Sequence, residues 1–294
     1  MKVLVATEKP FAAVAVDGIK KVVEDAGYEL ALLEKYTSKA ELLDAVTTAE
    51  VLDAAKQLKI VVRAGAGYDN VDLAAATAHN VCVENTPGQN SNAVAELVFG
   101  MAVMAVRNMY NGTSGSELKD KSLGIHAFGQ VGRNVARIAK GFGLNVSALD
   151  PYCPAEVMAA ADVTRVESVE DLYKNNKVVS LHIPATDETR KSVGFDLVTL
   201  LPKGGLLINT ARKEVIDEDG LCKALRERPD LKYVADVRPD NAEAMETEFA
   251  GRVFFTPKKM GAQTSEANIN AGIAAANQVV AFLRDGVDRF RVNK

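Results

Sequence analysis

Short apolar runs alternate with segments of helical periodicity along most of the chain. In the first part, strands are predicted at residues 2–7, 28–33, 59–64 and 81–84. Helices are predicted between them, at residues 11–26, 40–46, 51–58 and 72–79. Such alternation is typical of a parallel sheet covered by helices, so the predicted fold class is α/β.

A long helix of small residues, 92–107, has no evident strand partner and is predicted to connect two domains. Alternating segments then follow at 122–127, 146–149, 169–173, 178–182, 195–200, 206–209, 217–227, 233–237 and 253–255. The alanine-rich segment 265–284 is predicted to be a final helix that returns to the first domain. We therefore predict two Rossmann-like, doubly wound parallel-sheet domains with a cleft between them.

Composition narrows the class of partner. The chain has 294 residues, 48% of them hydrophobic, which suffices for two α/β domains with their own cores. A net charge of −4 and the lack of a long basic run argue against a nucleic-acid partner. No apolar stretch has the length of a membrane span, and the start of the chain reads as a strand, not a signal peptide. Cys82, Cys153 and Cys222 are far apart without metal-site spacing, as in a reducing cytosol.

Residues 121–152, KSLGIHAFGQVGRNVARIAKGFGLNVSALDPY, predict a dinucleotide site. A strand leads into a turn with Gly129 and Gly132, a helix follows, and Asp150 ends the next strand. In such a unit the helix N-terminus holds the pyrophosphate and the acidic residue accepts hydrogen bonds from the ribose. Asp150 would repel a 2′-phosphate, so NAD is predicted. Ala127 replaces the usual first glycine, which is acceptable if its φ stays negative.

Six blocks carry a family resemblance. They are RAGAGYDNVDLAAAT, ENTPGQNSNAVAEL, the dinucleotide unit, VVSLHIPATDETR, LPKGGLLINTARKEVIDEDGL and TPKKMGAQTSEAN, and they span residues 63–268. In this order the chain resembles the D-isomer-specific 2-hydroxyacid dehydrogenases, and within them the short 3-phosphoglycerate dehydrogenases. The resemblance implies a substrate-binding domain of residues 1–90 plus 268–294 and an NAD-binding domain of residues 91–267. It implies hydride transfer between C2 of 3-phosphoglycerate and NAD in the first step of serine synthesis, by a cytoplasmic homodimer.

The resemblance also assigns site residues. Arg212 matches the arginine that grips the substrate carboxylate and polarises the reacting oxygen. The loop Gly65, Ala66 and Gly67 matches the carboxylate-binding loop, and Asn90 matches a polar position facing the substrate. The implied cofactor-binding residues are Gly129, Gln130, Val131, Asp150, His182, Ile183, Pro184, Thr210, Ala211, Asp236, Gly261 and Ala262. Asp236 would lie near the nicotinamide carboxamide.

The acid/base position departs from the family pattern. The usual histidine of a P-H-x-G-A segment is absent from TPKKMGA, where Lys259 or Lys258 stands in its place. We prefer Lys259, because GAQTSEA aligns without a gap. In the family a helper glutamate, five residues beyond the aspartate, raises the basicity of the histidine. Here Asn241 occupies that helper position. This suits a lysine base, whose free pKa of about 10.4 must fall through burial and a cation such as Arg212.

Other departures leave substrate and activity open. The region after Ala45 is short, either by a true deletion or by an absent segment, and this leaves phosphate recognition to candidates such as Lys9. The arm after Asn108 is short too. We expect no regulatory domain for serine feedback, because the sequence runs only to RVNK after the final helix. The alternatives are a hydroxypyruvate, glyoxylate or D-lactate reductase of the same family, or a non-catalytic NAD-binding regulator.

Overall fold

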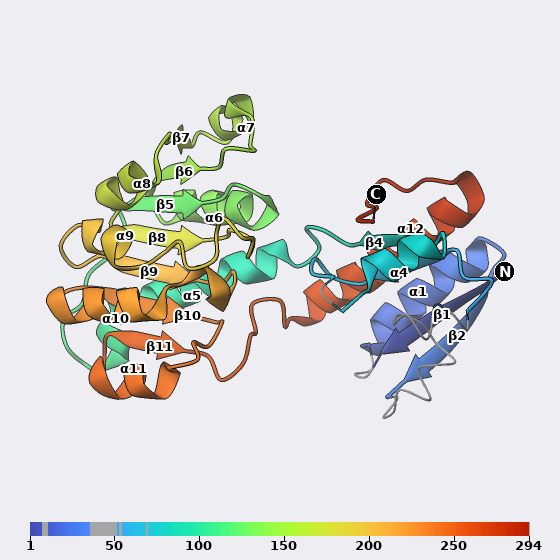
Figure 1. Ribbon diagram of the computed structural model, residues 1–294, viewed down its shortest axis with the longest axis horizontal. Helices are drawn as coiled ribbons and strands as arrows, with labels where there is room; N and C mark the ends of the chain where they lie inside the picture. Colours follow the sequence, from blue (N-terminus) through green and yellow to red (C-terminus); the bar gives the residue numbers. More distant parts are fainter. Residues whose placement is uncertain (8–10, 36–51, 53–54, 69, 294) are drawn as a thin grey trace. The chain divides into compact units, whose positions relative to one another are not determined.

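A computed structural model describes residues 1–7, 11–35, 52, 55–68 and 70–293. The predicted helix at 40–46, residues 51, 53 and 54 of the one at 51–58, the short region after Ala45, and also Lys9, lie outside the described residues. Leu52 is helical, but residues 55–58 form a turn in which the Leu58 amide donates to the Ala55 carbonyl at 2.9 Å, so the second of these helices does not reach residue 58 as predicted. The chain divides into two compact units, residues 1–90 with 263–294 and residues 91–262 (Figure 1). No helix among the described residues is both long enough and apolar enough to cross a membrane.

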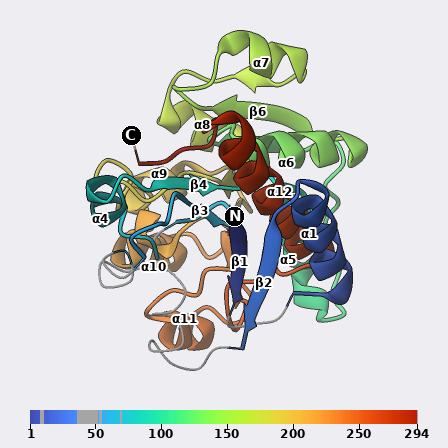
Figure 2. The ribbon, with the colours of Figure 1, turned by 90° about the vertical axis from the view of Figure 1, so that its right-hand side faces the viewer.

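The smaller unit combines both ends of the chain. Its strands are β1 (Lys2–Thr7), β2 (Glu29–Glu34), β3 (Ile60–Arg63) and β4 (Cys82–Asn85). Its helices are α1 (Ala13–Asp25), α4 (Leu73–Ala78) and α12 (Ser265–Asp285). The described strands form two parallel pairs, β1 with β2 and β3 with β4. Helices α1 and α12 lie side by side (Figure 2), and they approach closely because Gly18 leaves room for Ile273.

The larger unit is one parallel sheet. Its strands are β5 (Ser122–His126), β6 (Asn145–Leu149), β7 (Thr164–Arg165), β8 (Val178–Leu181), β9 (Leu206–Asn209), β10 (Lys232–Ala235) and β11 (Val253–Phe255). They lie in the order β11-β10-β9-β8-β5-β6-β7. This is the doubly wound order, with its switch point between β5 and β8, outside whose carboxyl ends ligands bind. The predicted α/β class is confirmed.

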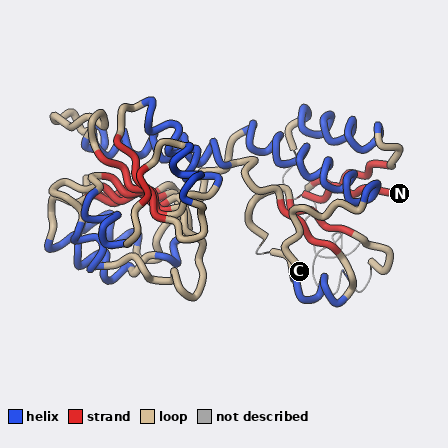
Figure 3. The backbone as a smooth tube through the Cα atoms, turned by 90° about the horizontal axis from the view of Figure 1, so that it is seen from above, coloured by secondary structure: helices blue, strands red, loops and turns tan. Residues whose placement is uncertain are grey.

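Helices cover both faces of this sheet (Figure 3). They are α5 (Ser91–Val106), α6 (Gln130–Gly141), α7 (Ala155–Ala160), α8 (Val169–Asn175), α9 (Phe195–Leu200), α10 (Glu218–Glu227) and α11 (Ala242–Glu248), with the 3-10 turns η1 (Asn108–Tyr110) and η2 (Lys213–Val215). Alternate strand residues join opposite cores: Leu207 belongs to one buried cluster and Ile208 to the other. This period of two explains why the central strands read as continuous apolar runs.

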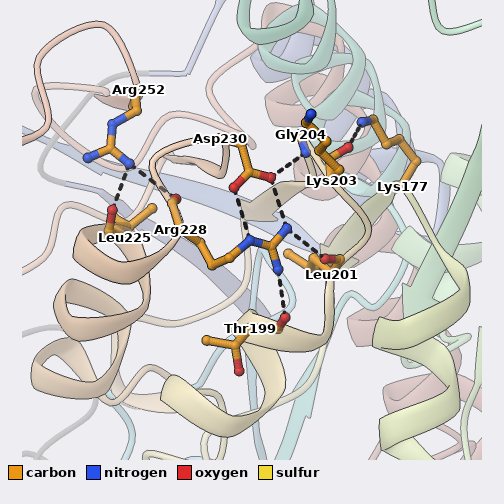
Figure 4. Close-up of polar contacts among 9 residues, drawn as sticks. All are labelled: Lys177, Thr199, Leu201, Lys203, Gly204, Leu225, Arg228, Asp230 and Arg252. Carbon is orange, nitrogen blue, oxygen red and sulfur yellow. Dashed lines mark hydrogen bonds and ion pairs between the residues drawn. The ribbon is translucent and has the colours of Figure 1, made fainter.

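An ion-pair network stabilises the amino-terminal edge of the sheet (Figure 4). The Arg228 guanidinium donates to both oxygens of Asp230, at 2.9 and 2.8 Å, and to the carbonyls of Thr199 and Leu201. Asp230 also accepts from the Gly204 amide at 2.6 Å. The network joins the segment before β9 to the segment before β10. Both members of the pair are partly buried, and Arg228 holds the pKa of Asp230 well below its usual range.

Candidate active site

The dinucleotide turn connects β5 to α6. Gly129 is the N-cap of α6, so the amides of Gln130 and Val131 lie in the first turn of the helix, where they have no intrahelical acceptor. A Cβ added to Gly129 would meet no atom within 4 Å, whereas one added to Gly132 would lie 2.4 Å from the Ala127 carbonyl oxygen. Gly129 therefore leaves its face open, and Gly132 permits close packing of helix on strand. Such a turn fits a pyrophosphate.

Ala127 corrects one prediction. Its φ is +82°, not negative. The turn imposes the conformation that the usual glycine adopts freely, and the alanine side chain makes it strained. The turn geometry thus prevails over the local preference of the residue.

Asp150 lies directly after β6 and points back to the turn. Its carboxylate accepts from the amide of Phe128 at 2.8 Å and from that of Tyr152 at 2.9 Å. These two backbone donors hold the half-buried carboxylate beside the glycine turn. The residue therefore lies where a ribose diol would find an acceptor.

Two histidines lie at the switch point, His126 ending β5 and His182 following β8. The amide of His182 donates to the carbonyl of His126 at 2.9 Å, and Ser180 Oγ lies 3.0 Å from His182 Nε2. Burial lowers the pKa of His126 to about 4 and that of His182 to about 3. Both rings are thus neutral near pH 7, which suits a role in lining the cofactor site better than a role in proton transfer. Ile183 is buried and Pro184 is exposed.

Asp236 is fully buried after β10. Its Oδ2 accepts from the amide of Gly261 at 2.7 Å, and a Cβ on Gly261 would lie 2.8 Å from that oxygen. Burial raises the pKa of the Asp236 carboxyl, while the Gly261 amide and the charges of Lys259 and Arg212 offset part of this increase. Among the described residues no donor reaches Asp236 Oδ1 or the Thr210 hydroxyl, although both are buried. An orphaned carboxylate oxygen fits the amide group of a nicotinamide.

Arg212 and Lys259 meet at one atom. Arg212 Nη1 donates to the carbonyl oxygen of Ala211 at 3.0 Å, and Lys259 Nζ donates to the same oxygen at 2.9 Å. The Lys258 side chain is exposed, and its backbone carbonyl accepts from Thr256 Oγ1. Lys259 is also exposed, so the burial expected for a lysine base is not found, whereas the expected cationic neighbour is present.

Asn241, at the helper position, faces elsewhere. Its side-chain Nδ2 lies 3.5 Å from Cys222 Sγ, and its backbone amide donates to Glu218 Oε2 at 3.1 Å. Asn209 is a site residue that the sequence analysis did not single out. Its buried side chain binds the backbone of Ala211 and Arg212. The signal was its place at the end of a strand, three residues before Arg212.

The predicted substrate loop lies in the smaller unit. The amide of Gly65 donates to the Arg63 carbonyl at 2.8 Å, so this one of the expected anion-binding amides is already used. The carbonyl of Ala66 accepts from Asn85 Nδ2 at 2.7 Å. A Cβ added to Gly65 would lie 1.5 Å from Arg63 Nη1, so the guanidinium lies over the loop. Gly67 and Asn90 are both half-buried.

The comparisons identify the family. The profile described as "D-isomer specific 2-hydroxyacid dehydrogenase, NAD binding domain" matches residues 93–257. The chain therefore belongs to the D-isomer-specific 2-hydroxyacid dehydrogenase family, and it carries the NAD-binding domain of that family.

The relatives that the chain matches include phosphoglycerate dehydrogenases and a hydroxypyruvate reductase. The chain is 35% identical over 253 residues to D-3-phosphoglycerate dehydrogenase of Methanocaldococcus jannaschii, covering 81% of this chain and 48% of that one. It is 31% identical to hydroxypyruvate reductase of Thermotoga maritima, covering 79% of this chain and 80% of that one. The NAD⁺-bound crystal structure of 3-phosphoglycerate dehydrogenase from Entamoeba histolytica is 44% identical, with a TM-score of 0.89 over 100% of this chain and 99% of that one. The chain spans about half the length of the phosphoglycerate dehydrogenase of Methanocaldococcus jannaschii.

Proposed function

We propose that the protein oxidises 3-phospho-D-glycerate to 3-phosphohydroxypyruvate with NAD as hydride acceptor, the first step of serine synthesis. The observation that carries the proposal is the convergence of Arg212 and Lys259 on the Ala211 carbonyl, in a chain of this dehydrogenase family. Held together, the guanidinium can bind the carboxylate of a 2-hydroxy acid and the amine can remove the proton of its hydroxyl group.

Each group has one role. NAD, when bound, supplies the hydride acceptor. Arg212 binds the substrate carboxylate through its guanidinium and polarises the oxygen on C2. Lys259, as the neutral amine, takes the proton of the C2 hydroxyl, so that the oxygen loses a proton, C2 loses a hydride, and C2 becomes a carbonyl carbon. In the reverse direction the ammonium returns that proton.

The cofactor residues complete the proposal. The amides of Gln130 and Val131 hold the pyrophosphate, Asp150 accepts from the ribose, and Asp236 Oδ1 accepts from the carboxamide. His182 with Ile183 and Pro184 lines the adenosine half, and Thr210, Ala211, Gly261 and Ala262 line the nicotinamide half. The donors and acceptors described above fit these groups.

Arg63 supports a phosphorylated substrate. It places a guanidinium over the loop of Gly65 to Gly67, where the resemblance assigns substrate binding. A guanidinium at this loop can bind a phosphate group, which 3-phosphoglycerate carries and lactate does not. A hydroxypyruvate reductase is the second candidate, because the relative of that name is matched over most of its own length.

The test is NADH formation from 3-phosphoglycerate, D-glycerate and D-lactate, by the parent and by Arg63→Gln. We expect the highest kcat/KM with 3-phosphoglycerate, and a loss of about tenfold in its preference over D-glycerate in Arg63→Gln. Lys59→Gln, at the other end of the β3 region, is the matched control.

Failure of the parent to turn over any 2-hydroxy acid while it still binds NADH would contradict the proposal and favour a non-catalytic NAD-binding regulator. The cytoplasmic homodimer belongs to the same proposal, and light scattering of the purified protein measures its mass.

A further inference from the structure

The carbonyl that receives Arg212 and Lys259 is itself held in place by a buried amide. Asn209, the last residue of β9, has no exposed surface. Its Oδ1 accepts from the amide of Ala211 at 2.9 Å, and its Nδ2 donates to the carbonyl of Arg212 at 2.9 Å. These bonds fix the peptide unit before the Ala211 carbonyl and the one after it. The Ala211 oxygen between them therefore has a fixed direction.

Asn209 is in turn anchored from the sheet. Its carbonyl accepts from the amide of Asp236 at 3.1 Å, and its Nδ2 lies 3.5 Å from the hydroxyl of Tyr233. The first contact continues the β9–β10 ladder, and the second is long for a hydrogen bond. The Asn209 side chain thus connects the β9–β10 ladder to the turn that carries Arg212 and that Lys259 contacts.

A neutral carbonyl is a suitable partner for a lysine that gains and loses a proton. Both an ammonium and an amine carry N–H groups, so Lys259 can donate to Ala211 in either state. A carboxylate partner would favour the ammonium far more strongly, and raise the pKa of the lysine. In this chain the family's helper carboxylate is replaced by Asn241, whose side-chain Nδ2 contacts Cys222 instead.

We propose that Asn209 is a positioning residue that sets both Arg212 and Lys259 through the Ala211 carbonyl, in place of the helper carboxylate. This inference rests on the proposed function. In this role Asn209 touches neither substrate nor cofactor. Its effect passes through the direction of one oxygen atom.

Asn209→Ser and Asn209→Asp test the proposal, with Tyr233→Phe as the matched control that keeps both backbone bonds of Asn209. In Asn209→Ser, kcat/KM should fall by about tenfold or more, while the Kd of NADH stays within about threefold of the parent. In Tyr233→Phe both should stay within about threefold. An Asn209→Ser variant with parental kcat/KM would overturn the inference.

The pH profile of Asn209→Asp separates positioning from a merely structural role. A protonated aspartic acid has the shape of asparagine and can donate to the Arg212 carbonyl, whereas the carboxylate cannot. The ratio of kcat/KM in this variant to that in the parent should therefore rise as the pH falls. A ratio that does not change with pH contradicts the inference. If Asn209→Asp does not fold, Asn209→Ser decides the question.

Oxalate binding to the NADH-loaded protein keeps this test independent of turnover. Oxalate resembles the planar 2-oxo acid and needs Arg212 in place. Its Kd should rise by about tenfold in Asn209→Ser and in Arg212→Gln, but not in Tyr233→Phe. A parent that binds oxalate but turns over no substrate defeats only the proposed function. Unchanged oxalate affinity in Asn209→Ser, or no oxalate binding by the parent, defeats the positioning role.

Discussion

Lys259 Nζ and Arg212 Nη1 donate to one and the same oxygen, the carbonyl of Ala211, at 2.9 and 3.0 Å. The two nitrogens are therefore separated by no more than the sum of these distances. Both charges also act on the buried Asp236, where they offset part of the increase that burial causes in the pKa of its carboxyl.

The first prediction concerns the choice between the two lysines. Lys259→Met should lower kcat by about 10²–10⁴-fold, the range for loss of a general base, with the Kd of NADH unchanged. Lys258→Met is the matched control and should keep kcat within about threefold, because it is the Nζ of Lys259 that reaches the Ala211 carbonyl beside Arg212. Steady-state kinetics with 3-phosphoglycerate measure both. A larger loss in Lys258→Met than in Lys259→Met would reassign the base.

The second prediction concerns the strained turn. Ala127→Gly should raise the free energy of unfolding by about 0.5–1 kcal/mol, because relief of the positive φ outweighs the added freedom of glycine in the unfolded chain. The same change at Ala136, inside α6, should lower it by about 1 kcal/mol. Urea unfolding of the two variants gives the comparison. Destabilisation by Ala127→Gly would mean that the turn carries no such strain.

The third prediction concerns the choice of cofactor. In Asp150→Ser the amides of Phe128 and Tyr152 lose their carboxylate acceptor and become available to a 2′-phosphate. The ratio of the Kd of NADPH to that of NADH should fall by about tenfold. Fluorescence titration measures both constants. Glu156→Gln, in the first turn of α7, should leave the ratio unchanged, and an unchanged ratio in Asp150→Ser itself would remove Asp150 from the cofactor site.

The fourth prediction concerns the Arg228–Asp230 pair. Its carboxyl has a lowered pKa in the folded protein, so the unfolded chain binds more protons, and the pair stabilises the fold above the ordinary pKa of aspartate, about 3.9. Asp230→Asn should lower the free energy of unfolding by about 1 kcal/mol at pH 7, because both side chains are partly exposed and solvent screens the pair.

The pH dependence of that loss is the measurement. The difference between parent and Asp230→Asn in urea unfolding should shrink as the pH falls below about 4. Asp285→Asn, in the more exposed pair with Arg284, should have little effect at any pH. Equal losses of unfolding free energy in Asp230→Asn and Asp285→Asn would contradict this prediction. The Asp230 pair would then stabilise the fold no more than an exposed surface pair does.

The sequence by itself determined the α/β class, the family and the dinucleotide unit. Each of these depends on order and spacing along the chain, such as the strand before Gly129 and Asp150 at the end of the next strand. It also indicated a lysine at the acid/base position, since no histidine stands in TPKKMGA.

The tertiary structure decided what those residues contact. It gave Ala127 a positive φ, because the turn must place α6 on the sheet, and it directed Asn241 toward Cys222. It also brought Lys259 to a carbonyl 48 residues away in the chain, beside Arg212 and above the buried Asn209. Ala211 follows β9 and Lys259 follows β11, two strands that lie on either side of β10 in the sheet. Their contact therefore depends on strand order and burial, which a linear pattern does not contain.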